Sequence, residues 1–210
     1  MKTGILSLLF VAFSTLSFSQ FAGPAGTPGS TAIHKDSSVF VNWANGAQLE
    51  LGLQDISTAF SGIVTNGDAN SPIGIPNGTT VSLGDSGVAI LTFSQPITNG
   101  TGPDFAVFEN GFSDSFLELA FVEVSSDGIN FHRFPAVSNT STNTQIGAFD
   151  ALGDATLLKN LAGKYRANFG TPFDLQELDG IFGLNTMAIT HEKIIDVVGM
   201  ISGNHVQTDS

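Results

Sequence analysis

The sequence contains no cysteine, so no disulfide stabilises the chain and no thiol can act as a nucleophile or metal ligand. Trp and Tyr occur once each although Phe occurs 18 times, so aromatic side chains that carry an N–H or O–H group are scarce. Only seven Lys and Arg residues accompany 19 Asp and Glu residues, which gives a net charge of −12. Nucleic acids and anionic membranes bind through Lys and Arg, so this deficit argues against both as partners.

The first 19 residues have the pattern of a secretory signal peptide. Lys2 supplies the positive start, residues 5–13 form the apolar core, and Ser17-Phe18-Ser19 is a small-x-small cleavage site. The apolar run is too short to span a membrane, and no later run is long enough. The sequence therefore predicts a protein that is secreted or exported to the cell surface, without membrane insertion. Its acidity agrees with a soluble, cation-binding protein.

About 190 residues follow the signal, which is enough for one cored domain. Residues 20–38 are rich in Gly and Pro and are predicted to form an extended lead-in, and residues 39–210 a single domain. Many short β-prone runs alternate with turn residues, which predicts an all-β fold. We expect an antiparallel β-sandwich of jelly-roll type, with one or two short helices in the connections.

Turn signals mark the predicted elements. The Ser126-Asp127-Gly128 turn between apolar runs indicates a β-hairpin, because glycine adopts the positive φ that such turns need. A helix is expected to begin at Thr171-Pro172-Phe173-Asp174 and to end at Gly180, and one or two helical turns at 155–162. Strands are predicted at 39–43, 50–56, 80–83, 88–93, 104–109, 117–125, 129–134 and 188–198.

Gly84-Asp85-Ser86-Gly87 resembles the surroundings of a hydrolase serine. The nucleophile hypothesis fails because the chain has no His and Asp in a supporting order. We interpret the motif as a tight turn, since Gly and Asp tolerate the required φ angles.

The acidic loop after residue 108 is the main candidate site. Glu109, Asn110, Asp114 and Glu118 offer hard oxygen ligands around a turn, which suits a structural Ca²⁺ ion. The alternative is that these side chains are solvated or accept hydrogen bonds from nearby backbone N–H groups.

Asp196 lies inside an apolar strand, where a carboxylate must be paired or point outward. Lys193 and Arg166 are its candidate ion-pair partners. The second interpretation is a catalytic acid with a raised pKa.

Four stretches together resemble a family of secreted, Bacteroidetes-type cell-surface proteins: DFAVFEN at 104–110, ELAFVEVSSDG at 118–128, LAGKYRANFGTPFDLQEL at 161–178 and ITHEKIIDVVG at 189–199. The resemblance covers roughly residues 27–199 and implies no established enzymatic activity. AFVEVSSDGINFHRF also resembles the hairpin of discoidin-like, galactose-binding jelly rolls, which implies a glycan-binding module. The family pattern continues beyond Ser210, which implies a fragment without the closing strand and sorting signal.

These observations predict a non-enzymatic binding or adhesion module for a glycan or another surface polymer. Trp43, Asn110 and Phe112 are its expected ligand contacts; the alternative for Trp43 is a place in the core. Two other functions remain open. A carbohydrate-active hydrolase would need two carboxyl groups about 5–9.5 Å apart with one pKa raised. A purely structural presenting domain would have no cleft.

Overall fold

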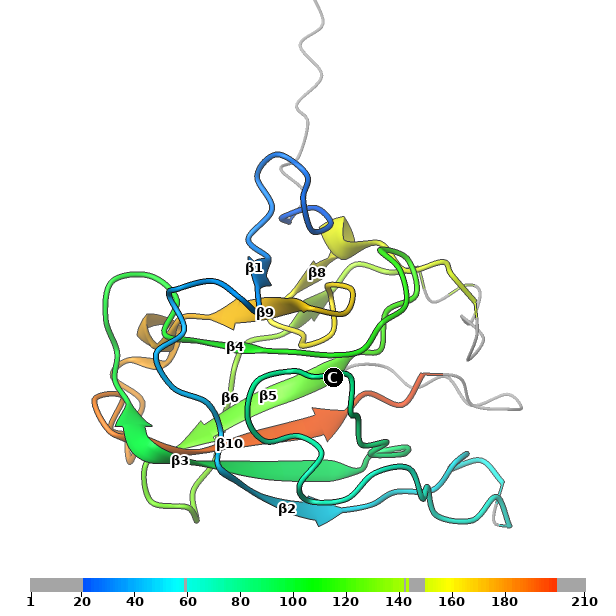
Figure 1. The fold of residues 1–210 in the computed structure, drawn as a ribbon, viewed down its shortest axis with the longest axis horizontal. Coiled ribbons are helices and arrows are strands. Elements are labelled where there is room, and N and C mark those ends of the chain that lie inside the picture. The colour runs from blue at the N-terminus through cyan, green and yellow to red at the C-terminus, as the bar shows by residue number, and fades with distance from the viewer. Residues whose placement is uncertain (1–20, 59, 142, 144–149, 200–210) are drawn as a thin grey trace, which may run out of the picture.

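The structure is a computed structural model that describes residues 21–58, 60–141, 143 and 150–199. The predicted signal peptide lies outside these residues. Among the described residues, two antiparallel sheets face each other (Figure 1). The smaller sheet has the order β1 (Ile33–His34), β9 (Phe169–Phe173), β4 (Phe105–Val107), and the larger has the order β2 (Gly46–Glu50), β3 (Val88–Ile97), β10 (Ile189–Asp196), β5 (Ala120–Ser125), β6 (His132–Arg133). The predicted all-β sandwich is confirmed.

Short elements complete the fold. β7 (Val137–Ser138) pairs with β8 (Leu158–Lys159), and two 3₁₀ helices, η1 (Ala155–Leu157) and η2 (Leu175–Leu178), lie in connections. No helix in the described part of the chain has the length and apolarity needed to cross a bilayer.

The core lies between the two sheets. Val122 and Ile194 are register partners on β5 and β10, and both belong to the buried cluster. Phe173 of the smaller sheet is fully buried, with its ring centroid 5.3 Å from that of Phe105 and 5.0 Å from that of Phe134. Side chains alternate along each strand, so every second residue contributes to this core. Burial of each Phe side chain contributes roughly 2–3 kcal/mol to stability.

The predicted hairpin is confirmed. β5 and β6 are antiparallel neighbours, and Gly128 in the turn has a φ of 74°. Asp127 organises the turn, since its carboxylate accepts hydrogen bonds from the backbone N–H groups of Ile129 and Asn130, both at 2.8 Å. An Asp-Gly turn is a local signal, so sequence alone locates it well.

Four predicted elements are wrong. Of the strand predicted at 50–56, only Glu50 lies in a strand, as the last residue of β2, and the strand predicted at 80–83 is absent. Residues 39–43 have no strand, and the expected helix start at Thr171-Pro172 lies in β9, where Pro172 is paired with Ala106 of β4. The pairing of β9 with two strands outweighs the local helix signal. The capping residue is nevertheless Asp174, whose carboxylate accepts a hydrogen bond from the N–H of Gln176 at 2.9 Å and starts η2.

The lead-in is part of the domain. Its residues 33–34 form β1 on the edge of the smaller sheet, and the hydroxyl groups of Thr31 and Tyr165 lie 2.8 Å apart. Ala25 is buried and belongs to a small second cluster with Tyr165. Gly and Pro in this segment shape turns, and the segment is held in place by contacts that composition does not reveal.

Candidate ligand-binding cleft

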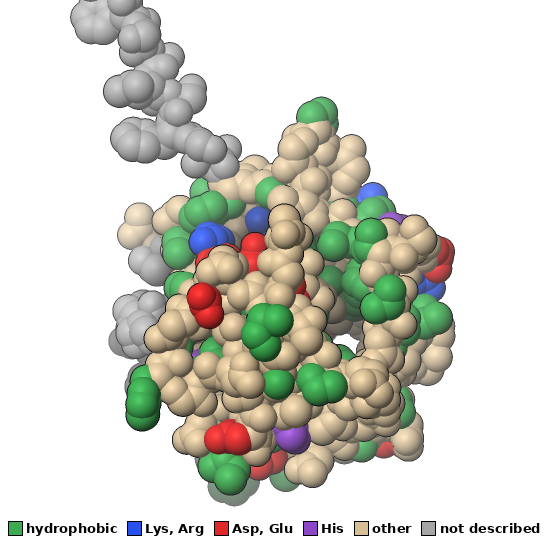
Figure 2. All heavy atoms as spheres, turned by 90° about the vertical axis from the view of Figure 1, so that its left-hand side faces the viewer, with side chains coloured by type: hydrophobic (Ala, Val, Ile, Leu, Met, Phe, Trp, Pro, Cys, Tyr) green, Lys and Arg blue, Asp and Glu red, His purple; other side chains and the backbone are tan. Residues whose placement is uncertain are grey.

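A cavity of about 700 Å³ opens between the larger sheet, β4 and two irregular segments, 39–44 and 71–84. We call it the cleft. Figure 1 shows the segment between β1 and β2 running from the smaller sheet to the larger one across the front. In Figure 2, hydrophobic side chains gather around a hollow on one side of the molecule. The apolar part of the lining includes Val64, Ile73, Val81, Leu83, Ala89, Leu91, Phe93, Phe105, Val107 and Ile194.

Three aromatic rings form one wall of the cleft. The ring centroid of Phe40 lies 5.1 Å from that of Trp43, and the ring of Phe108 lies 5.5 Å from each of them. All three side chains are partly exposed and line the cleft. Aromatic faces of this kind are surfaces on which a flat or cationic ligand group packs.

The ionisable side chains that line the cleft are all acidic. Among the described residues that line it, none is Lys, Arg or His, and six are acidic: Asp85, Asp104, Glu109, Glu118, Glu192 and Asp196. Lys35 lies outside this lining, and its Nζ donates a hydrogen bond of 2.7 Å to the carbonyl of Pro76, which lines the cleft. The cleft therefore carries an excess of acidic groups over basic ones.

Glu109, Glu118 and Asp196 interact with one another at one end of the cleft. Burial raises the pKa of Glu109 to about 8, with a further contribution from Glu118. Burial likewise raises the pKa of Asp196 to about 7, and the neighbouring Asp85 and Glu118 act in the same direction. Partial desolvation raises the pKa of Glu118, which lies at the rim. Repulsion and desolvation both disfavour ionisation, so Glu109 and Asp196 hold protons close to neutral pH.

Two tight backbone contacts hold this acidic end together. In the 84–87 turn, Ser86 has a φ of 60°, and its N–H donates to the Asp196 carboxylate. The motif is thus a turn, as predicted. On the other side, Gly163 has a φ of 78°, and a Cβ there would overlap the carbonyl oxygen of Glu118. Only glycine combines this φ with such a close approach.

Glu192 lies deeper in the cleft, away from the acidic end. It is opposite Leu91 on β3 and Val124 on β5, on the same face of β10 as Asp196. Its side chain is 4% exposed, and its Oε1 atom has no hydrogen-bond partner. Burial raises the pKa of Glu192 to about 8. A buried polar atom without a partner costs free energy, so it points to a ligand group or to a functional constraint.

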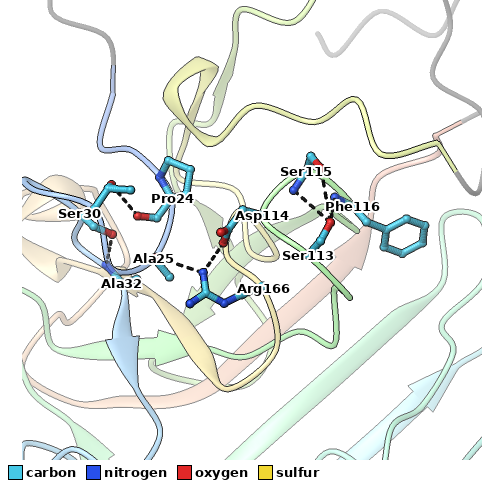
Figure 3. Close-up of polar contacts among 10 residues, drawn as sticks. Pro24, Ala25, Ser30, Ala32, Ser113, Asp114, Ser115, Phe116 and Arg166 are labelled. Atoms are coloured by element: carbon cyan, nitrogen blue, oxygen red, sulfur yellow. Dashed lines mark hydrogen bonds and ion pairs between the residues drawn. The ribbon is translucent and has the colours of Figure 1, made fainter.

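Five of the residues singled out from the sequence meet in the cleft: Trp43, Glu109, Asn110, Glu118 and Asp196. Phe112 does not, because its side chain is 79% exposed and packs beside Phe116, with the ring centroids 5.1 Å apart. Asp114 is also separate, since its carboxylate pairs with the Arg166 guanidinium, which in turn donates to the carbonyl of Ala25 at 3.0 Å (Figure 3).

The expected calcium ligands therefore do not converge. Glu109, Asn110 and Glu118 line the cleft, whereas Asp114 links its loop to the N-terminal segment. In the described part of the chain, no three His, Cys, Asp or Glu side chains form a group suited to a metal ion.

The expected ion pairs of Asp196 are wrong. Lys193 pairs with Glu123 on the outer face of the larger sheet, and Arg166 pairs with Asp114. Lys193 is three residues from Asp196 on a strand, so the two side chains point to opposite faces. Asp196 instead faces the cleft.

Sequence reasoning missed Glu192 and Asp85. The signal for Glu192 was its place two residues before Ile194 and four before Asp196, which puts all three on one face of a strand. Asp85 gave no such signal, because only the fold brings the 84–87 turn beside β10.

Comparisons with protein-family models, curated proteins and solved structures gave no match.

Proposed function

We propose that this protein is an exported, non-enzymatic binding module that takes part of a glycan or another surface polymer into the cleft. The observation that carries the proposal is that Trp43 lines the same cavity as Glu109 and Asn110, although it is far from them in the sequence. A cavity with a mostly apolar lining and a few polar groups is the usual form of a small-molecule site. A purely structural presenting domain would need no such cleft.

The chemistry of the cleft suits a sugar. The C–H face of a sugar ring packs on an aromatic ring, which the wall of Phe40, Trp43 and Phe108 provides. Sugar hydroxyl groups both donate and accept hydrogen bonds. Carboxyl groups whose pKa lies close to neutral pH can also do both, because the protonated form donates and the ionised form accepts. Glu109 and Asn110 lie near this wall, next to Phe108 in the chain.

A glycan array followed by titration calorimetry tests the proposal. We expect Trp43→Ala to weaken binding at least tenfold, because it removes the largest ring of the aromatic wall. Phe112→Ala is the matched control, since Phe112 is an exposed aromatic outside the cleft lining, and it should leave affinity unchanged. Equal affinities of both variants and the wild type would contradict a glycan site in the cleft.

A carbohydrate-active hydrolase is the second candidate, and one observation favours it. Glu109 has a pKa raised to about 8 and interacts with Glu118 and Asp196, so a proton donor and a second carboxyl group share one end of a cleft. Release of reducing ends from any glycan that binds would support hydrolysis, provided that Glu109→Gln abolishes it. Binding without turnover leaves the module non-enzymatic.

A structural calcium ion is a separate proposal that now rests on Glu109, Asn110 and Glu118, all in the cleft lining. Carboxylate and amide oxygens are the ligands that calcium prefers. Thermal melts in chelator and in millimolar calcium test it. A higher melting temperature in calcium, lost in Glu118→Gln, supports the ion, and identical melts exclude it.

A further inference from the structure

The charge of the cleft limits which glycans it can take. Six acidic side chains and no basic one line it among the described residues. A glycan that carries carboxylate or sulfate groups would bring further negative charge to this surface, where desolvation and mutual repulsion already disfavour ionised carboxylates. Neutral and cationic sugars are the compatible classes.

Glu192 separates these two classes. Its Oε1 atom is buried without a hydrogen-bond partner, in a part of the cleft lined by Leu91 and Ile194. A hydroxyl group would satisfy this oxygen but add no charge attraction. An ammonium group offers three N–H donors and a positive charge, and hydrogen bonds to charged groups are roughly twice as strong as neutral ones.

A second carboxyl group lies at a defined distance. Glu192 and Asp196 are four residues apart on the same face of β10, and a strand rises about 3.3 Å per residue. Their positions are therefore about 13 Å apart along the strand. A ligand that reaches both must be longer than one sugar ring and must carry two groups that carboxyl groups can bind.

We propose that the ligand is a glycan with free amino groups, an amino-sugar oligomer whose ammonium groups contact Glu192 inside the cleft and Asp196 at its acidic end. The aromatic wall supports this assignment, because a cation over the face of Trp is attracted to the ring. The inference rests on the proposed glycan-binding function and names the class of glycan.

Titration calorimetry in chelator compares two probes, a β-1,4-linked glucosamine tetramer and its fully N-acetylated counterpart. The two have the same backbone and differ in charge. We expect the wild type to bind the glucosamine tetramer at least tenfold more tightly, with an affinity that falls as salt is raised. Because burial keeps the Glu192 carboxyl protonated near neutral pH, binding of an ammonium group should also release a proton, which makes the measured enthalpy depend on the buffer.

Three variants complete the test. Glu192→Gln and Asp196→Asn keep the shape and remove the charge, so each should lower the ratio of the affinity for the glucosamine tetramer to the affinity for the acetylated tetramer. Glu192→Gln should also reduce the dependence on buffer, because one of the two carboxyl groups that release a proton is removed. Glu50→Gln is the control, because Glu50 is exposed on β2 and outside the cleft lining.

The outcomes distinguish the inference from the function on which it rests. Equal affinity for the two tetramers, or a preference for the acetylated one, overturns the amino-sugar assignment while the glycan site stands. If neither tetramer binds, the assignment is also wrong, and the array with Trp43→Ala then decides independently whether the cleft binds another glycan.

Discussion

Glu192→Gln should make the protein more stable at neutral pH and reduce its sensitivity to alkaline conditions. The Glu192 carboxyl has a pKa of about 8 in the folded protein, against 4.5 for an ordinary Glu. Between these values the unfolded chain releases the proton and the folded protein retains it. The unfolded state is therefore favoured increasingly as pH rises from 4.5 to 8.

The magnitude follows from the two pKa values. Each pH unit between them lowers the free energy of unfolding by about 1.4 kcal/mol, so the loss is about 3 kcal/mol at pH 7 and about 5 kcal/mol above pH 8. Glutamine has nearly the same shape as the protonated carboxyl group and does not titrate. The variant should match the wild type at pH 4.5 and exceed its unfolding free energy by about 3 kcal/mol at pH 7.

Urea unfolding of the ligand-free wild type, Glu192→Gln and Glu50→Gln at a series of pH values measures the effect. Glu109 and Asp196 also have raised pKa values, so the wild-type curve contains their contributions as well. The difference between wild type and Glu192→Gln isolates position 192. Parallel curves for these two proteins would refute the reasoning, because they would show that the carboxyl is solvated in the folded state.

Three further predictions concern the surroundings of the cleft. Gly163→Ala should lower the free energy of unfolding by at least about 3 kcal/mol. Gly74→Ala is the control and should lower it by only about 1 kcal/mol, because Gly74 has a similar φ of 79° but no atom lies within 4 Å of the added Cβ. Equal urea midpoints for the two variants would contradict the close approach at Gly163. Arg166→Met should lower the free energy of unfolding by roughly 1–2 kcal/mol, since it removes the contacts to Asp114 and Ala25. It should also speed proteolysis within residues 21–32, which the Ala25 contact holds in place. An unchanged cleavage rate would show that the arginine does not hold this segment. Hydrogen bonds from Asn130 and Ile129 hold the Asp127 pKa below its usual 3.8. An NMR titration should therefore find this carboxylate still ionised at acidic pH values at which other Asp side chains are protonated. A titration midpoint at 3.8 or above would count against the turn geometry.

Local signals in the sequence located much of the fold. The Asp127-Gly128 hairpin, residues 88–93 in the first part of β3 and the whole of β10 are all found where turn residues and apolar runs predicted them. The predicted helix at Thr171 was wrong because the pairing of β9 with β1 and β4 outweighs the preference of Thr-Pro-Phe-Asp for a helix start. The predicted strand at 39–43 was wrong because these residues line the cleft and have no strand partner.

For the site, the sequence alone determined that the protein is strongly acidic, that its polar aromatics are scarce, and that Glu109, Asn110 and Glu118 lie close together in the chain. Only the tertiary structure decided which residues meet. Antiparallel pairing brings β10 between β3 and β5, which places Glu192 and Asp196 on the inner face of the larger sheet, and the 84–87 turn then meets Asp196. These contacts join residues far apart in the chain, and side-chain periodicity along one strand carries no information about which other strand lies beside it.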